Sequence, residues 1–130
     1  EVEPIWKTSA GSNVPSPVYF KGHLYWVSDK GIAHCLDSET GKIVYQERLK
    51  AAGRVYASVL LAEGRLYAVS REKGTWVLAA QPEFKQLAHN VFESDSSIFN
   101  GSPAILGSNI YLRSDEKIYC IGGDQKKSRL

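Results

Sequence analysis

The sequence predicts an all-β fold built from a repeated four-stranded unit, and three observations carry this prediction. First, an aliphatic residue followed by tyrosine recurs at Tyr25, Tyr67 and Tyr111, which are 42 and 44 residues apart. Second, short apolar runs alternate with turns that contain Gly or Pro. Third, no long stretch keeps the period of an amphipathic helix. A period of about 40 to 45 residues is typical of one β-propeller blade, which has four antiparallel strands.

The first repeat covers about residues 14–50 and shows every expected strand. Its first two strands flank a tight turn at residues 21–22, and its third strand follows Gly31 over residues 32–37. A polar turn then contains Gly41, which can adopt the positive φ that closes such loops. The fourth strand is expected at residues 43–45. Its clearest strand, residues 24–27, is a continuous apolar run, as expected for strands covered on both faces.

The later repeats, at about residues 51–92 and 93–124, follow the same order with losses. In the second repeat, residues 80–83 take the place of the polar turn but lack its Asp and its Thr-Gly pair. Residues 84–92 form a weaker fourth strand. The third repeat has three strands before Gly122-Gly123. Residues 1–8 resemble a lone fourth strand. The chain is therefore predicted to be a single propeller segment, residues 1–130, with about three blades if the N-terminal strand completes the last one.

Three blades are too few to close a ring, because propellers typically have about four to eight. The sequence thus predicts an incomplete propeller: either a piece of a longer one, or half of a six-bladed ring built by two chains that exchange strands. Because an open array leaves blade faces and an edge strand bare, we expect self-association in both cases. The chain does not begin with Met, which is expected of a processed chain or an excised piece.

The first repeat resembles a known family in its motifs. These are Ser16-Pro17, the strand around Tyr25, the Gly31-led strand ending in Leu36-Asp37, and the turn Thr40-Gly41-Lys42. Together they are similar to the pyrroloquinoline-quinone (PQQ) type propeller repeat. That repeat occurs in quinoprotein alcohol dehydrogenases and in a cofactor-free branch, which includes the lipoprotein of the outer-membrane β-barrel assembly machinery. The resemblance implies a periplasmic or extracellular location and an architecture, but no activity.

We expect no catalytic residue, no cofactor and no metal site. No aspartate matches the catalytic one of the dehydrogenases, and His23, His34 and His89 fall at unrelated positions without carboxylate or Cys neighbours at ligand spacing. Cys35 and Cys120 share the same small apolar position in two repeats, so both are expected to be buried. The tryptophans are expected to pack between blades, and Trp6 aligns with Tyr45 on the fourth strand.

Composition excludes two further classes of function. The net charge is +2, and the basic residues cluster only at Lys126-Lys127-Ser128-Arg129, which is expected to be a solvated tail and no nucleic-acid site. No apolar run approaches the about 20 residues that cross a bilayer.

The function predicted from the sequence is a non-catalytic binding or scaffold module for a protein or peptide partner. Connections between blades are where a propeller usually presents function. The best candidate for a contact is the connection at residues 93–101, which is acidic at its start and carries an Ile-Phe pair that is expected to be exposed. Ser97, Ile98 and Phe99 are its possible partner-contact residues. The alternative is a fragment of a PQQ-dependent oxidoreductase that lacks its catalytic blades.

Overall fold

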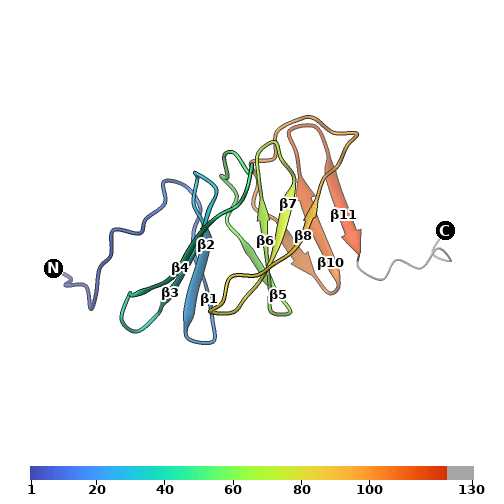
Figure 1. The fold of residues 1–130 in the computed structure, drawn as a ribbon. Coiled ribbons are helices and arrows are strands. Elements are labelled where there is room, and N and C mark those ends of the chain that lie inside the picture. Colours follow the sequence, from blue (N-terminus) through green and yellow to red (C-terminus); the bar gives the residue numbers. More distant parts are fainter. Residues whose placement is uncertain (123–130) are drawn as a thin grey trace.

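The computed structural model describes residues 1–122, which form three antiparallel sheets arranged one after another like a fan (Figure 1). The first sheet contains β1 (Val18–Phe20), β2 (His23–Val27), β3 (Ile32–Asp37) and β4 (Ile43–Arg48). The second contains β5 (Leu60–Ala62), β6 (Arg65–Val69), β7 (Thr75–Ala79) and β8 (Gln86–Asn90). The third contains β9 (Ala104–Leu106), β10 (Asn109–Arg113) and β11 (Ile118–Gly122). The all-β fold of propeller blades is confirmed.

The three sheets repeat the same strand register. Tyr25 lies opposite Cys35, Tyr67 opposite Val77, and Tyr111 opposite Cys120. The pairing of the third and fourth strands also repeats, because Cys35 faces Tyr45 and Val77 faces Ala88, with a bulge one residue further on in each sheet. Positions that align in the sequence repeats are therefore equivalent in space.

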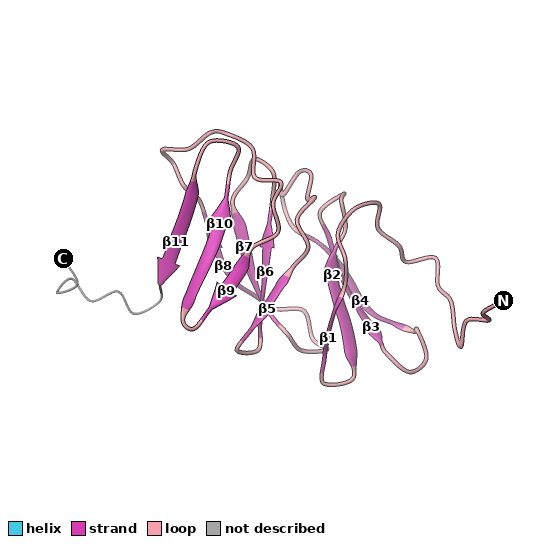
Figure 2. Cartoon of the chain, turned by 180° about the vertical axis from the view of Figure 1, so that it is seen from behind, coloured by secondary structure: helices cyan, strands magenta, loops and turns pink. Residues whose placement is uncertain are grey.

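Apolar side chains fill the spaces between successive sheets. The larger core cluster includes Tyr25 and Cys35 of the first sheet and Leu66 and Trp76 of the second. The smaller cluster joins the second sheet to the third. The second sheet is covered on both faces, which explains its continuous apolar strands. Figure 2 shows from behind that, within residues 1–122, only strands and loops build this core.

Residues 1–8 form no strand, so the lone fourth strand predicted there is absent from the structure. A strand needs the hydrogen-bonding edge of a neighbour, and the edge predicted for these residues belongs to β11. The N-terminal segment and β11 lie at opposite ends of the fan (Figure 1). Within one chain the two cannot pair.

The predicted burial of both cysteines is right for Cys35 and wrong for Cys120, whose side chain is exposed. Cys120 lies on the face of the third sheet that points away from the second sheet. Leu106 and Ile118, each 72% exposed, share that face. The repeat places an apolar residue there because a following blade would cover it, and no described residue does so.

No helix within residues 1–122 has the length and apolar character needed to cross a membrane. The basic cluster at residues 126–129 and the end of the third predicted repeat lie outside the described residues.

Candidate functional site

The connections between successive sheets gather at one end of the fan, which we call the loop face. It contains the connections at residues 49–59 and 91–103, together with the turns that join the second and third strands of each sheet (upper end in Figure 1). Backbone hydrogen bonds tie these segments together. The Arg71 N–H donates to the Arg54 carbonyl and the Phe99 N–H to the Arg71 carbonyl, both at 2.9 Å. Backbone hydrogen bonds therefore hold the segments of the loop face in fixed positions relative to one another.

The predicted contact residues Ser97, Ile98 and Phe99 lie on this face, but Phe99 does not point to solvent. Its side chain is 8% exposed and stacks on Phe92 and Tyr119, with ring centroids 6.1 and 6.3 Å away. The expected exposure of the Ile-Phe pair is therefore wrong for Phe99, because its ring fills the gap between the second and third sheets. Ser97 and Ile98 are half-buried. Their contact with a partner stays a prediction.

A buried carboxylate anchors the same connection. Asp95 accepts hydrogen bonds from the hydroxyls of Ser97 at 2.5 Å, Tyr119 at 2.7 Å and Ser114 at 2.9 Å. These bonds, led by the one from Ser97, hold the pKa of Asp95 well below its usual range. The Asp95 carboxylate raises the pKa of Tyr119 to about 12. With its acceptor capacity used in this way, Asp95 orders the loop.

A half-buried arginine of the loop face is held in place by two neighbours. The Arg71 guanidinium lies 4.5 Å from the centroid of the Tyr56 ring, and its Nε donates to Asn100 Oδ1 at 2.8 Å. We call Tyr56, Arg71 and Asn100 the Arg71 cluster. Beside it, Arg54 pairs with Asp29 at 3.3 Å. Tyrosine and arginine, together with tryptophan, are enriched among the residues that dominate the energetics of protein interfaces.

Sequence reasoning missed the Arg71 cluster. Its members come from three separate segments: the two connections and the turn between β6 and β7. No motif links them, and only the packing of the second sheet between its neighbours brings them together. The repeat alignment could have indicated that all three segments share one end of the fan.

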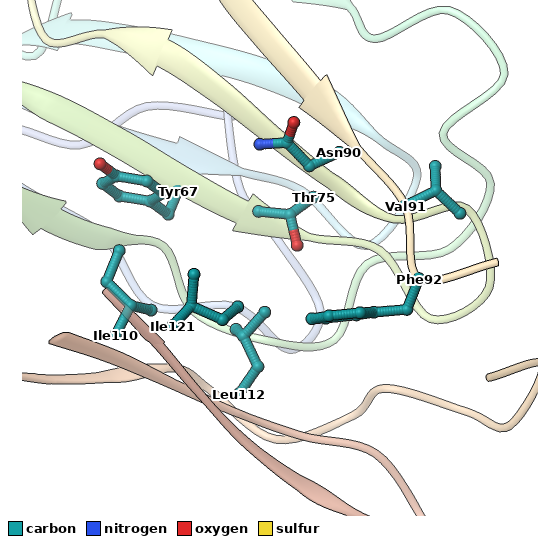
Figure 3. A pocket seen from close by; sticks show the side chains of 8 residues that line it. All are labelled: Tyr67, Thr75, Asn90, Val91, Phe92, Ile110, Leu112 and Ile121. Atoms are coloured by element: carbon teal, nitrogen blue, oxygen red, sulfur yellow. The ribbon is translucent and has the colours of Figure 1, made fainter. Parts of the chain in front are cut away.

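A cavity of about 220 Å³ lies between the second and third sheets (Figure 3). Tyr67 and Thr75 of the second sheet face Ile110, Leu112 and Ile121 of the third across this space. Asn90, Val91 and Phe92 complete its lining. Most of these side chains are apolar, so the cavity fits an apolar group.

The spaces on the two sides of the second sheet are filled by aromatic residues of different size. Trp76 belongs to the core between the first and second sheets. Its equivalent in the third sheet is Tyr119. Trp76 precedes Val77, which lies opposite Tyr67, and Tyr119 precedes Cys120, which lies opposite Tyr111. Tyr119 is smaller, and it stacks on Phe92 at 4.1 Å while its hydroxyl bonds Asp95.

The histidines stay apart and two of them stack on tryptophans. The His34 ring lies 4.7 Å from that of Trp26, and the His89 ring 3.8 Å from that of Trp76. Burial lowers the pKa of His34. Among residues 1–122, no three His, Cys, Asp or Glu side chains gather as a metal site would require.

Trp6 also packs, although residues 1–8 form no strand. Its indole ring lies directly against Gly41, where an added Cβ would collide with it, and its Nε1 donates to the Ser38 carbonyl at 3.0 Å. Trp6 thus covers the turn between β3 and β4.

Comparison with known proteins agrees with this geometry. The family model of the outer membrane protein assembly factor BamB matches residues 3–121. The chain belongs to this family. No curated protein is similar enough in sequence to count as a relative.

Solved propeller structures resemble the chain in fold. The computationally designed Ika8 protein matches with a TM-score of 0.67 at 11% identity, over 89% of this chain and 36% of Ika8. A quinohemoprotein alcohol dehydrogenase from Comamonas testosteroni matches with a TM-score of 0.66 at 19% identity, over 82% of this chain and 18% of the enzyme. The designed Ika4 protein matches with a TM-score of 0.60 at 8% identity, over 94% of this chain and 100% of Ika4. The chain thus spans little more than a third of Ika8 and under a fifth of the enzyme.

Proposed function

We propose that this chain is a non-catalytic propeller segment that binds a protein or peptide partner through its loop face, in the periplasm or outside the cell. The Arg71 cluster carries the proposal. Its guanidinium is already fixed by Tyr56 and Asn100, so binding costs little further side-chain entropy. Membership of the BamB family supports a protein partner, since proteins named as assembly factors act on other proteins.

The chemistry of the loop face supports recognition of an acidic segment that also carries an apolar side chain. Arg71 lies beside Arg54, and both guanidinium groups lie on the same surface as Tyr56. A guanidinium fork suits carboxylates, and a tyrosine ring suits apolar or cationic side chains. A segment that carries a carboxylate next to an apolar side chain would use both.

Selection of peptides from a displayed random library against this chain tests the proposal. We expect selected peptides to bind the loop face and to lose about tenfold or more in affinity for Arg71→Ala, as interface hot spots do. The matched control is Arg65→Ala, because Arg65 is an exposed arginine at the opposite end of the same hairpin. Binding by calorimetry would be unchanged in this control. The proposal would be overturned if the selected peptides bound the Arg71→Ala variant with unchanged affinity, or if the selection gave no binders at all.

The rival function is that of a segment from a PQQ-dependent oxidoreductase. The likeness to the alcohol dehydrogenase, at 19% identity, shows the fold alone. Titration of the chain with pyrroloquinoline quinone and calcium, followed by ultraviolet-visible absorption, separates the two functions. Saturable binding at micromolar quinone would favour the oxidoreductase and contradict the non-catalytic platform.

A further inference from the structure

We propose that a cleft on the loop face, between the Arg54 and Arg71 guanidinium groups, binds one carboxylate group. The cleft has a volume of about 70 Å³ and lies where the connection at residues 52–54 meets the turn at residues 71–73. This inference rests on the proposed function in one respect: the carboxylate would come from the protein or peptide partner. It names the chemical group that the loop face recognises.

A buried serine fixes both walls of the cleft. The Ser70 hydroxyl, in a residue that is 1% exposed, donates to the Ala52 carbonyl at 2.5 Å. The same oxygen accepts the backbone N–H of Lys73 at 3.1 Å. The Arg71 N–H adds a direct bond to the Arg54 carbonyl. Because these bonds join the two walls within the chain itself, the cleft is formed before a partner binds.

The side chains that line the cleft are mostly cationic. Three of them are basic, namely Arg54, Arg71 and Lys73, and Glu72 is acidic. The one ion pair within residues 1–122 joins Arg54 to Asp29, which does not line the cleft. Glu72 therefore forms no ion pair with the three cations, and an anion in the cleft would meet net positive charge.

Both guanidinium groups are oriented by contacts that leave donors for a ligand. Arg71 gives its Nε–H to Asn100 Oδ1, and Arg54 gives an Nη1–H to Asp29 at 3.3 Å. Within residues 1–122, the Nη atoms of Arg71 donate to no side chain or carbonyl. A guanidinium offers two parallel N–H groups to the two oxygens of a carboxylate. The free Nη donors of Arg71 suit that pairing.

The equivalent turn of the third sheet has the same local structure and different charges. Residues 70–73 read Ser-Arg-Glu-Lys, and residues 114–117 read Ser-Asp-Glu-Lys. In each turn the serine hydroxyl accepts the N–H of the lysine. In each, the second residue donates its N–H to a carbonyl of the preceding connection, that of Arg54 or that of Ile98. Ile98 and Asp115 thus take the places of the two arginines, so the anion cleft depends on side chains and not on the shared turn.

Titration with sodium acetate, followed by NMR, tests the cleft directly. Acetate carries the carboxylate group with little else, and sodium chloride at the same ionic strength controls for screening. We expect the Nε–H signal of Arg71 and the backbone N–H signals of Arg54 and Lys73 to shift saturably with acetate and not with chloride. Lys73→Ala would weaken acetate binding about twofold to fivefold, the usual effect of one exposed ion pair.

The matched control is Lys117→Ala. Lys117 occupies the place of Lys73 in the equivalent turn, and both residues are exposed. We expect acetate binding to be unchanged in this control. No saturable shift at the cleft, or equal weakening by both variants, would overturn the proposal. Saturable shifts with inorganic phosphate and none with acetate would also overturn it, because the cleft would then select a different anion.

Peptides selected against the loop face separate this inference from the proposed function. In a peptide that depends on Arg71, we expect replacement of one Asp or Glu by its amide to lower the affinity about tenfold or more. The same replacement would cost less in the Lys73→Ala variant, because the two changes remove one shared interaction. If the peptides depend on Arg71 but no such replacement changes their affinity, the carboxylate cleft is wrong and the proposed function stands. If acetate binds the cleft but no peptide does, the proposed function fails and the carboxylate site stands.

Discussion

At the scale of single residues, glycines allow the tight turns that connect neighbouring strands. Gly41 and Gly64 are both turn glycines with a φ of +72°. An added Cβ at Gly64 would meet nothing within 4 Å, whereas at Gly41 it would enter the Trp6 ring. The two positions thus require glycine for different reasons: Gly64 for backbone conformation alone, and Gly41 also for the space that Trp6 occupies.

Replacement of these glycines by alanine separates the two requirements. We expect Gly64→Ala to lower the free energy of unfolding by about 1–2 kcal/mol through left-handed strain. Gly41→Ala would lose about 1–3 kcal/mol more, because the new methyl group displaces Trp6. Urea unfolding measures the loss, and a red shift of tryptophan fluorescence reports the displaced ring. Equal losses for the two variants would show that Trp6 does not pack on Gly41 in solution.

Asp95 makes the stability of the fold depend on acid pH. Its folded pKa lies below the value of about 3.9 for an unfolded chain, so the unfolded state binds protons first as the pH falls. The carboxylate therefore stabilises the fold fully above about pH 4, and this contribution is lost as the pH falls further. We expect Asp95→Asn to lower stability at neutral pH and to flatten the decline below pH 4. Urea midpoints across this range measure it, and an unchanged slope would refute the role of Asp95.

At the scale of whole elements, the connection at residues 91–103 behaves as part of the core. Phe99 and Phe92 pack with Leu112 between the second and third sheets, and Asp95 ties the loop to the third sheet through Ser114. Such a connection stabilises the contact between two blades.

Truncation of Phe99 distinguishes a core role from a contact role. We expect Phe99→Ala to lower the free energy of unfolding by about 3–5 kcal/mol, the usual cost of removing a buried phenylalanine. Leu106→Ala serves as the control, because Leu106 is 72% exposed and little packing is lost there. Thermal or urea unfolding measures both variants. A small effect of Phe99→Ala on stability would mean that the ring is free to contact a partner.

The hairpins show which parts of an element could be predicted. The turns at residues 21–22 and 63–64 and the runs around Tyr25 and Tyr67 follow from local turn chemistry and apolar spacing, and the structure has them in register. The weak fourth strand predicted within residues 84–92 is β8. Residues 1–8 carry the same pattern and form no strand, because pairing needs an edge that the pattern cannot provide.

At the scale of the whole molecule, an open fan leaves its two ends unequal. Within residues 1–122, one end carries the N-terminal segment over the first sheet, and the other carries the third sheet, whose strand β11 pairs with β10 alone and whose outer face exposes Leu106 and Ile118.

The sequence by itself determined the blade repeat, the strand order within each blade and the family. It could do so because apolar spacing and turn residues act between neighbours in the chain. Only the tertiary structure decided that Phe99 is buried, that Cys120 is exposed and that Arg71 is held by Tyr56 and Asn100. Each of these depends on which sheet stands beside which. Which sheet lies beside which depends on packing between blades, and the spacing of apolar residues within one blade does not determine that packing.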